Sequence, residues 1–132
     1  MKLYIFIVLL AILGCAQNVS IQDKERVVDA GYFFQLSEKN ELELKIDKLE
    51  REHGIKLFIY TVISENYYSQ KDYSNAVFNF LQARTEGSKS PILLIYLSYE
   101  ERAIKIKVNS SGAKKFNDSV CHLLVGTIEK FF

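Results

Sequence analysis

Three segments of the chain place apolar residues at helical spacing. The first follows Ser37, whose hydroxyl can cap a helix, and ends at Gly54, which can adopt the left-handed backbone of a helix terminus. The second begins near Ser69 and Asp72, which resemble a capping box, and continues to about Arg84. The third reaches the end of the chain. The three apolar stripes consist of Leu42, Ile46 and Leu49; of Tyr73, Ala76, Val77, Phe80 and Leu81; and of Phe116, Val120, Leu123, Leu124, Ile128 and Phe131.

Three other runs have the pattern of β-strands. Residues 55–63 and 92–97 are rich in Ile, Leu, Phe, Tyr and Val, which is typical of buried strands, and the helix between them makes the pair parallel. Residues 103–108 alternate apolar side chains with lysines and follow a short link, which predicts a hairpin with one solvated face. Residues 26–31 are expected to form an extended lead-in and residues 109–112 a turn. The pattern therefore predicts an α/β protein with a mixed sheet of three or four strands covered by three main helices.

A separate apolar run precedes these elements. Lys2 is followed by eleven apolar residues, 3–13, and then by the small residues Gly14, Cys15 and Ala16. This pattern is typical of a secretory signal peptide, and the run is shorter than the roughly 20 residues that a membrane span needs. Two processing alternatives stay open, cleavage after Ala16 and lipidation of Cys15. The expected organisation is a signal peptide at 1–16, a polar tether at 17–25 and a folded domain at 26–132, either free in the periplasmic or extracellular space or lipid-anchored at a membrane surface.

Charge and cysteine content narrow the classes of function. The 132 residues, enough for one domain, carry 17 Lys and Arg against 16 Asp and Glu, and removal of Lys2 with the signal peptide makes the mature domain neutral. A neutral domain lacks the positive field that captures nucleic acid, so no nucleic-acid partner is expected. Because Cys15 is either removed or lipidated, Cys121 stands alone and no intramolecular disulfide is expected.

Several local strings follow one another in an informative order. They are Val28-Asp29-Ala30-Gly31 before Leu36-Ser37, the helix 41–53 closed by Gly54, Tyr60-Thr61-Val62, Asp72-Tyr73-Ser74-Asn75-Ala76, and Ile92-Leu93-Leu94 followed by Glu101-Arg102. In this order and spacing, across residues 27–118, the chain resembles the TPM domain family, which includes a thylakoid-lumen acid phosphatase and an auxiliary protein of levamisole-type acetylcholine receptors. The resemblance implies an exported or membrane-tethered α/β/α sandwich that acts near a membrane protein or complex.

The resemblance also implies an acidic cleft that binds divalent cations, with weak acid phosphatase activity in some members. Asp29 matches the acid of the first motif, Glu101 and Arg102 match its acid–arginine pair, and Asp118 matches an acid near the last helix. Other family positions differ: Lys89-Ser90-Pro91 replaces an Asp-Asn-Gly, and residues 109–113 replace a Gly-Tyr-Gly and its following Glu. We therefore expect a partly degenerate member that is short at its C-terminal end.

The candidate site residues have two interpretations. Calcium needs about six to eight oxygen ligands, and Asp29, Glu100, Glu101 and Asp118 can supply some of them, while Arg102 can bind an anion. Equally, the glutamates can be solvated turn charges, Asp29 can close its own turn, and Arg102 can form an ordinary salt bridge. No cofactor is therefore assigned, and calcium is the candidate. No catalytic residue is assigned, because the sequence shows neither a Walker-type phosphate loop nor a histidine within a ligand cluster.

Aromatic residues near two predicted loops indicate a partner surface. Tyr32 and Phe33 precede the first helix, and Tyr67 and Tyr68 precede the second. Such side chains are enriched in interface cores, although they can also fill the core of their own domain. The expected function is an exported, TPM-like accessory or binding module, noncatalytic and membrane-anchored if Cys15 is lipidated, that acts on a membrane protein or envelope complex. The alternative is a weak acid phosphatase that depends on a divalent cation.

Overall fold

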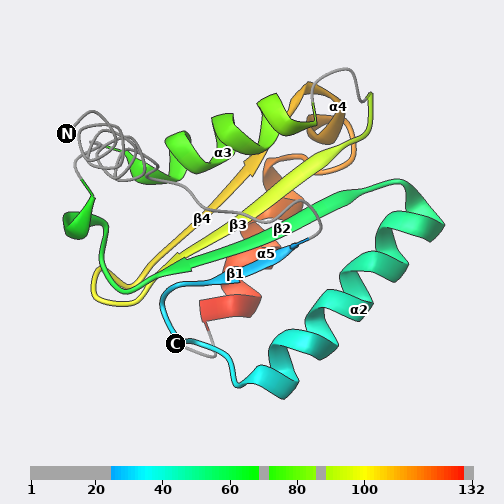
Figure 1. Cartoon of the computed structure of the whole chain (residues 1–132). Helices are drawn as coiled ribbons and strands as arrows, with labels where there is room; N and C mark the ends of the chain where they lie inside the picture. The colour runs from blue at the N-terminus through cyan, green and yellow to red at the C-terminus, as the bar shows by residue number, and fades with distance from the viewer. Residues whose placement is uncertain (1–24, 69–71, 86–88, 130–132) are drawn as a thin grey trace, which may run out of the picture.

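A mixed sheet of four strands lies at the centre of the structure (Figure 1). The computed structural model describes residues 25–68, 72–85 and 89–129. The expected signal peptide, the lipidation site Cys15 and all but the last residue of the tether lie outside the described residues. In chain order the elements are β1 (Val27–Asp29), α2 (Leu36–His53), β2 (Lys56–Val62), the 3₁₀ helix η1 (Glu65–Tyr67), α3 (Tyr73–Arg84), β3 (Ile92–Ser98), β4 (Ala103–Val108), α4 (Ser110–Ala113) and α5 (Asp118–Glu129).

The strand pairing follows the predicted crossover and hairpin. β2 and β3, which α3 connects, pair in parallel from Lys56 opposite Ile92 to Val62 opposite Ser98. β4 returns beside β3 in the antiparallel direction. β1 comes from the stretch expected to be only an extended lead-in, and it pairs in parallel with the other edge of β2. The prediction of a mixed sheet in an α/β fold is confirmed, with four strands in the order β1-β2-β3-β4.

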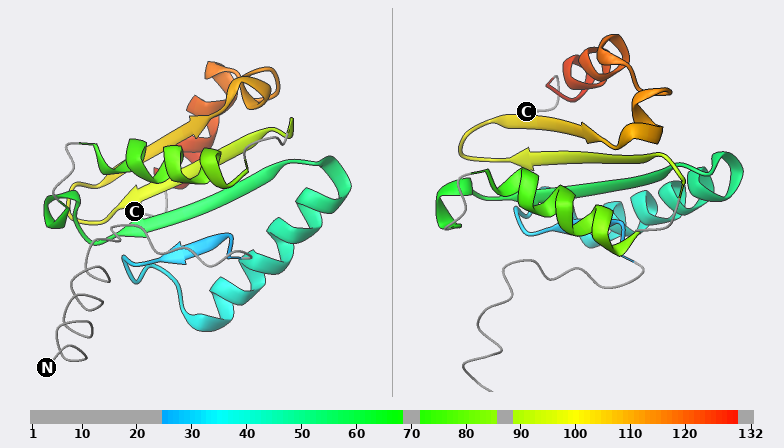
Figure 2. Two further views of the ribbon diagram at one scale, coloured as in Figure 1. Left: turned by 45° about the horizontal axis from the view of Figure 1, so that its top comes forward. Right: turned by 90° about the horizontal axis from the view of Figure 1, so that it is seen from above.

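Helices cover both faces of this sheet, which gives the predicted three-layer sandwich. Successive strand residues point to opposite faces, so Phe58 and Tyr60 pack on the side of α3, whereas Ile59 packs with Ile46 of α2. α3 and α5 lie on opposite sides of the sheet (Figure 2, right). Within the described ranges, no helix is long and apolar enough to cross a membrane.

The helix ends agree with the sequence in part. Gly54 terminates α2 with a φ of 66°, and its N–H donates to the Glu50 carbonyl at 2.8 Å, as predicted. The N-cap of α2 is Gln35 rather than Ser37, and Glu38 accepts the Gln35 N–H at 2.8 Å. The chain enters the helix two residues earlier than predicted, because Glu38 satisfies the free N–H at this end. For α3 the N-cap is Asp72, and Ser69 lies outside the described residues.

The predicted turn at residues 109–112 is instead the entrance to a short helix, α4. The Asn109 side chain accepts hydrogen bonds from the backbone N–H of Gly112 at 2.7 Å and of Ile92 at 2.9 Å, and it donates to the Ser90 carbonyl at 3.1 Å. Asn is favoured both in turns and at helix N-caps, so composition alone does not distinguish the two. The Asn109 side chain thus joins the end of β4 to the start of β3.

Three tyrosines meet in the core between the sheet and α3. The Tyr60 and Tyr73 hydroxyls lie 3.1 Å apart and share a hydrogen bond. Tyr96 stacks on Tyr60, with 6.2 Å between ring centroids, but its buried hydroxyl has no hydrogen-bond partner among the described residues. Burial first, and then the nearby carboxylate of Glu65, raise the pKa of Tyr96, so the hydroxyl remains neutral at physiological pH.

Removing this hydroxyl is expected to stabilise the protein. The Tyr96→Phe variant should raise the free energy of unfolding by about 1 kcal/mol, because a buried and unpaired polar group is lost while the ring is kept. Tyr60→Phe is the matched control, and it should lower the free energy of unfolding by about 1 kcal/mol because it removes a formed hydrogen bond. Urea unfolding of both variants measures the difference, and a less stable Tyr96→Phe variant would contradict the prediction.

Candidate functional site

Three loops meet at one edge of the sheet. β1, β2 and β3 are parallel, so the loops that follow Asp29, Val62 and Ser98 all leave from the same edge (Figure 1). In open α/β sheets, ligands bind in the crevice outside the carboxyl ends of the strands. The loops at this edge are therefore where a ligand site is expected.

Asp29 holds the first loop in place. One carboxylate oxygen accepts the backbone N–H of Phe33 and the other that of Phe34, each at 2.9 Å. The hydroxyl of Thr61, on the neighbouring strand, donates to Asp29, and its oxygen accepts the N–H of Gly31 at 2.9 Å. The carboxylate thus closes its own turn, as one of the two sequence interpretations proposed, and also ties that turn to β2.

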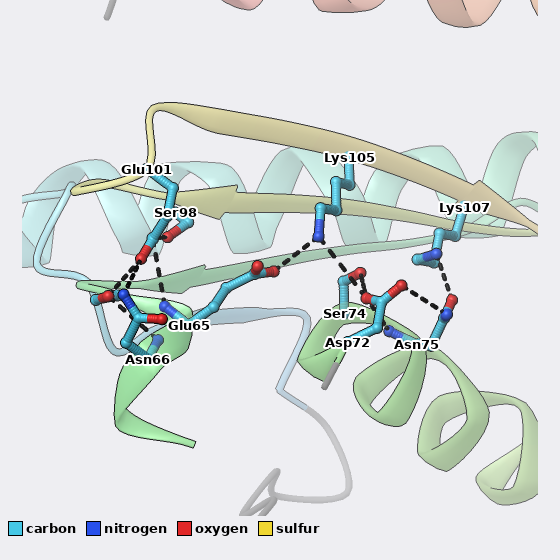
Figure 3. A network of polar contacts seen from close by, with 10 residues as sticks. Glu65, Asn66, Asp72, Ser74, Asn75, Ser98, Glu101, Lys105 and Lys107 are labelled. Carbon is cyan, nitrogen blue, oxygen red and sulfur yellow. Dashed lines mark hydrogen bonds and ion pairs between the residues drawn. The ribbon is translucent and has the colours of Figure 1, made fainter. Parts of the chain in front are cut away.

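Glu101 likewise holds the hairpin turn between β3 and β4 in place. The buried hydroxyls of Ser64 and Ser98 both donate to its carboxylate. Figure 3 shows Ser98 beside Glu101. The Glu65 N–H donates at 3.3 Å and the Asn66 side-chain amide at 3.4 Å. The Ser64 hydroxyl, then the Ser98 hydroxyl and the Glu65 N–H, lower the pKa of Glu101 to about 2. Glu101 therefore joins the hairpin turn to the loop that follows β2.

A second set of contacts fixes η1 and α3 to β4. Lys105 lies 2.9 Å from the Glu65 carboxylate and 3.7 Å from that of Asp72, and Lys107 donates to Asn75 (Figure 3). The Ser74 hydroxyl, with further help from Lys105, lowers the pKa of Asp72. The lysines predicted to meet water on β4 thus reach acidic and amide groups on the α3 side.

Two residues in these loops have a backbone that L-amino acids rarely adopt. Tyr32 has a φ of 56° and Arg102 a φ of 47°, and they are the non-glycine residues with positive φ among those described. Left-handed backbone costs a residue with a Cβ about 1–2 kcal/mol. Tyr32 lies between Gly31, whose N–H bonds to Thr61, and Phe33, whose N–H bonds to Asp29, and Arg102 follows Glu101 directly. The two carboxylates thus support the two strained positions.

Both strained residues line the same open cleft, which we call the aromatic cleft. Its volume is about 830 Å³, and its lining residues are Gly31, Tyr32, Phe33, Ile63, Tyr99, Glu100 and Arg102. Tyr32 is 83% exposed and Tyr99 64% exposed, and Phe33 contacts Tyr99 edge-on with 5.9 Å between ring centroids. Tyr67, which is 69% exposed, donates its hydroxyl to Glu100 at 3.4 Å beside the cleft.

The structure separates the four acids considered as cation ligands. Asp29 and Glu101 lie at the cleft edge of the sheet but use their oxygens to hold loops, and Glu100 lines the cleft. Asp118 is the first residue of α5. This helix follows α4, which lies near the start of β3. In the described part of the chain, no group of three or more Asp, Glu, His or Cys residues is placed to hold a metal ion. This donor set does not fit a hard cation that needs about six oxygen ligands.

Tyr68 and Tyr99 differ from the expectations about aromatic residues. Tyr68, a candidate for the partner surface, stacks on Tyr73 with ring centroids 3.7 Å apart and packs against the core. Tyr99, which the sequence placed only in a hairpin link, projects into the cleft. An exposed aromatic residue in a short turn after an apolar strand is the sequence signal that could have identified it.

Gly31 leaves no room for a side chain at the wall of the cleft. A Cβ on Gly31 would lie 2.8 Å from the Phe33 ring and 2.8 Å from the Val62 carbonyl, so Gly31→Ala should lower the free energy of unfolding by about 2 kcal/mol. Gly126→Ala is the control, because a Cβ on Gly126 meets nothing within 4 Å and alanine favours the helix by about 0.5–1 kcal/mol. Thermal unfolding should show opposite shifts, and equal shifts would contradict this account.

Comparison with known protein families gives one match. A family model described as the TPM domain matches residues 27–132, from the first residue of β1 onwards. No curated protein matches the chain. The match covers most of the chain and includes the strand edge from which Asp29 and Glu101 support the cleft. The chain therefore belongs to the TPM domain family.

Proposed function

We propose that this TPM domain is a noncatalytic binding module that holds part of a partner protein in the aromatic cleft. One observation carries the proposal: two exposed tyrosines from separate loops, Tyr32 and Tyr99, project at one open cleft. Large rigid aromatic rings bury area at low entropic cost, which is why they dominate protein interfaces. A concave site of this size fits a protruding segment of another protein.

In this proposal the acids beside the cleft have a structural role. Asp29 accepts from two backbone N–H groups and a hydroxyl, and Glu101 accepts from four donors. Phosphate-ester hydrolysis needs an activated nucleophile or a polarising cation. Both carboxylates already accept hydrogen bonds that hold the loops. This arrangement supports a structural role, the shaping of the cleft, better than a role in activating a nucleophile or binding a cation.

The proposal includes export and a partner at a membrane. The apolar run 3–13, the small residues after it and the family of the chain all support this location. If Cys15 is lipidated, the module is held at a membrane surface, and its partner is a membrane protein or envelope complex. If the chain is cleaved after Ala16, the exported module has no lipid anchor at Cys15 and binds the same partner from solution.

Photo-crosslinking of the full chain in the cells that produce it tests the proposal. A photoreactive amino acid is placed at Tyr32 or Tyr99, and at Leu44 as the control, because Leu44 is 71% exposed on α2 and lies outside the cleft. The same protein should be captured from positions 32 and 99, at least about tenfold more efficiently than from position 44. Equal capture from all three positions, or no capture from the cleft, would overturn the proposal.

An activity assay separates the proposal from the phosphatase alternative. The purified chain is incubated with p-nitrophenyl phosphate, with and without calcium. We expect no turnover above that of an Arg102→Gly variant, in which glycine accepts the positive φ without strain. Calcium-dependent turnover that this variant loses would favour the phosphatase instead.

A further inference from the structure

We infer that the segment bound in the aromatic cleft carries a carboxylate next to an aromatic or large apolar side chain, and that Arg102 selects it. This inference rests on the proposed function and specifies the chemistry of the partner. Both non-glycine residues with left-handed backbone among those described, Tyr32 and Arg102, line the aromatic cleft. Backbone strain gathered at one place points to a function there.

Arg102 occupies a turn position that favours glycine or asparagine. Its N–H donates to the Tyr99 carbonyl at 3.2 Å, which closes the hairpin turn, and its positive φ follows at the end of that turn. Glu101, next to it, is bonded to four donors on neighbouring elements and holds the turn in this shape. The fold therefore keeps an arginine where a smaller residue would fit the backbone better.

The guanidinium of Arg102 is the group in the cleft that can bind an acidic ligand. The guanidinium of Arg102 is exposed and has no ion-pair or hydrogen-bond partner among the described residues, so its donors are free for a carboxylate. Glu100, the acid that lines the cleft, accepts the Tyr67 hydroxyl at 3.4 Å. The neighbouring carboxylates of Asp29 and Glu101 are occupied by the loops. In the described part of the chain, the lining of the cleft thus carries one positive and one negative side chain, and the guanidinium of Arg102 is the charged group whose donors are free for a ligand.

The rings beside Arg102 define the rest of the ligand. Phe33 and Tyr99 meet edge-on, and with Ile63 they make an apolar wall, while the exposed ring of Tyr32 stands at the rim. An aromatic or large apolar side chain can stack there while an adjacent carboxylate pairs with Arg102. A flat membrane surface cannot enter such a concavity, so a peptide segment is the occupant that fits.

Fluorescence anisotropy with the full chain tests the inference. Three labelled nine-residue peptides are compared: a central Phe flanked by two Asp, the same peptide with Lys in place of both Asp, and the Asp peptide with Ala in place of Phe. The first should bind at least about tenfold more tightly than either of the others. Arg102→Gly should remove the preference for Asp over Lys, and Glu100→Gln should strengthen binding of the Asp peptide by about threefold through loss of repulsion.

The outcomes distinguish this inference from the proposed function. Equal or tighter binding of the Lys peptide, a preference that survives Arg102→Gly, or no binding of any peptide would overturn the inference. Crosslinking from positions 32 and 99 would still stand in each of those cases, and would leave the binding module with a partner of different chemistry. Loss of the crosslinks would overturn both.

Discussion

Glu101→Ala is expected to lower the free energy of unfolding by about 4 kcal/mol, the largest effect predicted for a single loop residue in this protein. The carboxylate accepts from Ser64 and Ser98, whose side chains are fully buried. Without Glu101 these two hydroxyls lose their acceptor where water has little access, and each such loss costs about 1–3 kcal/mol. Urea unfolding followed by circular dichroism measures the change.

The neighbouring glutamate provides the matched control. Glu100 lies in the same turn, is exposed, and accepts only the Tyr67 hydroxyl among the hydrogen bonds described, at 3.4 Å. Glu100→Ala should therefore change the free energy of unfolding by less than about 0.5 kcal/mol. If the two variants lost similar stability, the turn itself, and not the serine contacts of Glu101, would account for the loss.

The same carboxylate makes stability depend on acid. Hydrogen bonds from Ser64 and Ser98 lower the pKa of Glu101 in the folded protein from 4.5 to about 2. The folded state therefore binds fewer protons than the unfolded state, so the contribution is present above pH 4.5 and is lost as the pH falls towards 2. Between those pH values, the stability of Glu101→Gln should fall less steeply than that of the wild type. Parallel curves would contradict the assignment.

Asp29→Ala is expected to lower the free energy of unfolding by about 3 kcal/mol. The buried Thr61 hydroxyl loses its acceptor, and the N–H groups of Phe33 and Phe34 lose theirs at a place that water reaches only in part. The loop that carries Tyr32 then has no support for its left-handed backbone. Urea unfolding measures the stability, and binding of the Asp-Phe-Asp peptide should weaken in the same variant.

A surface aspartate is the control for this second prediction. Asp47 lies on α2, is mostly exposed, and pairs with Arg51 one turn away at 3.1 Å. Exposed pairs of this kind contribute about 0.3–0.5 kcal/mol, so Asp47→Ala should be nearly neutral. An equally small effect of Asp29→Ala would show that the loop is held by other contacts, and would remove the structural part that we give to Asp29.

The elements of the fold follow from local patterns. Continuous apolar runs predicted β2 and β3, alternation predicted β4, and helical stripes predicted α2, α3 and α5, because burial on one face or two faces leaves its period in the sequence. Boundaries were less certain: Gln35 and Asn109 cap helices where Ser37 and a turn were expected. Several side chains can satisfy a helix terminus, so the choice depends on which neighbour reaches it.

The aromatic cleft could not be predicted from local sequence patterns, because it depends on contacts between distant parts of the chain. Asp29 meets Thr61 across 32 residues and Glu101 meets Ser64 across 37. From the sequence these acids were possible cation ligands, and folding brings hydroxyl and amide donors to them instead. The positive φ of Tyr32 and Arg102 carries no local signature either, because neither residue type favours it. Periodicity encodes which side of an element is buried, whereas hydrogen bonds between loops form only once the sheet has brought the strand ends together.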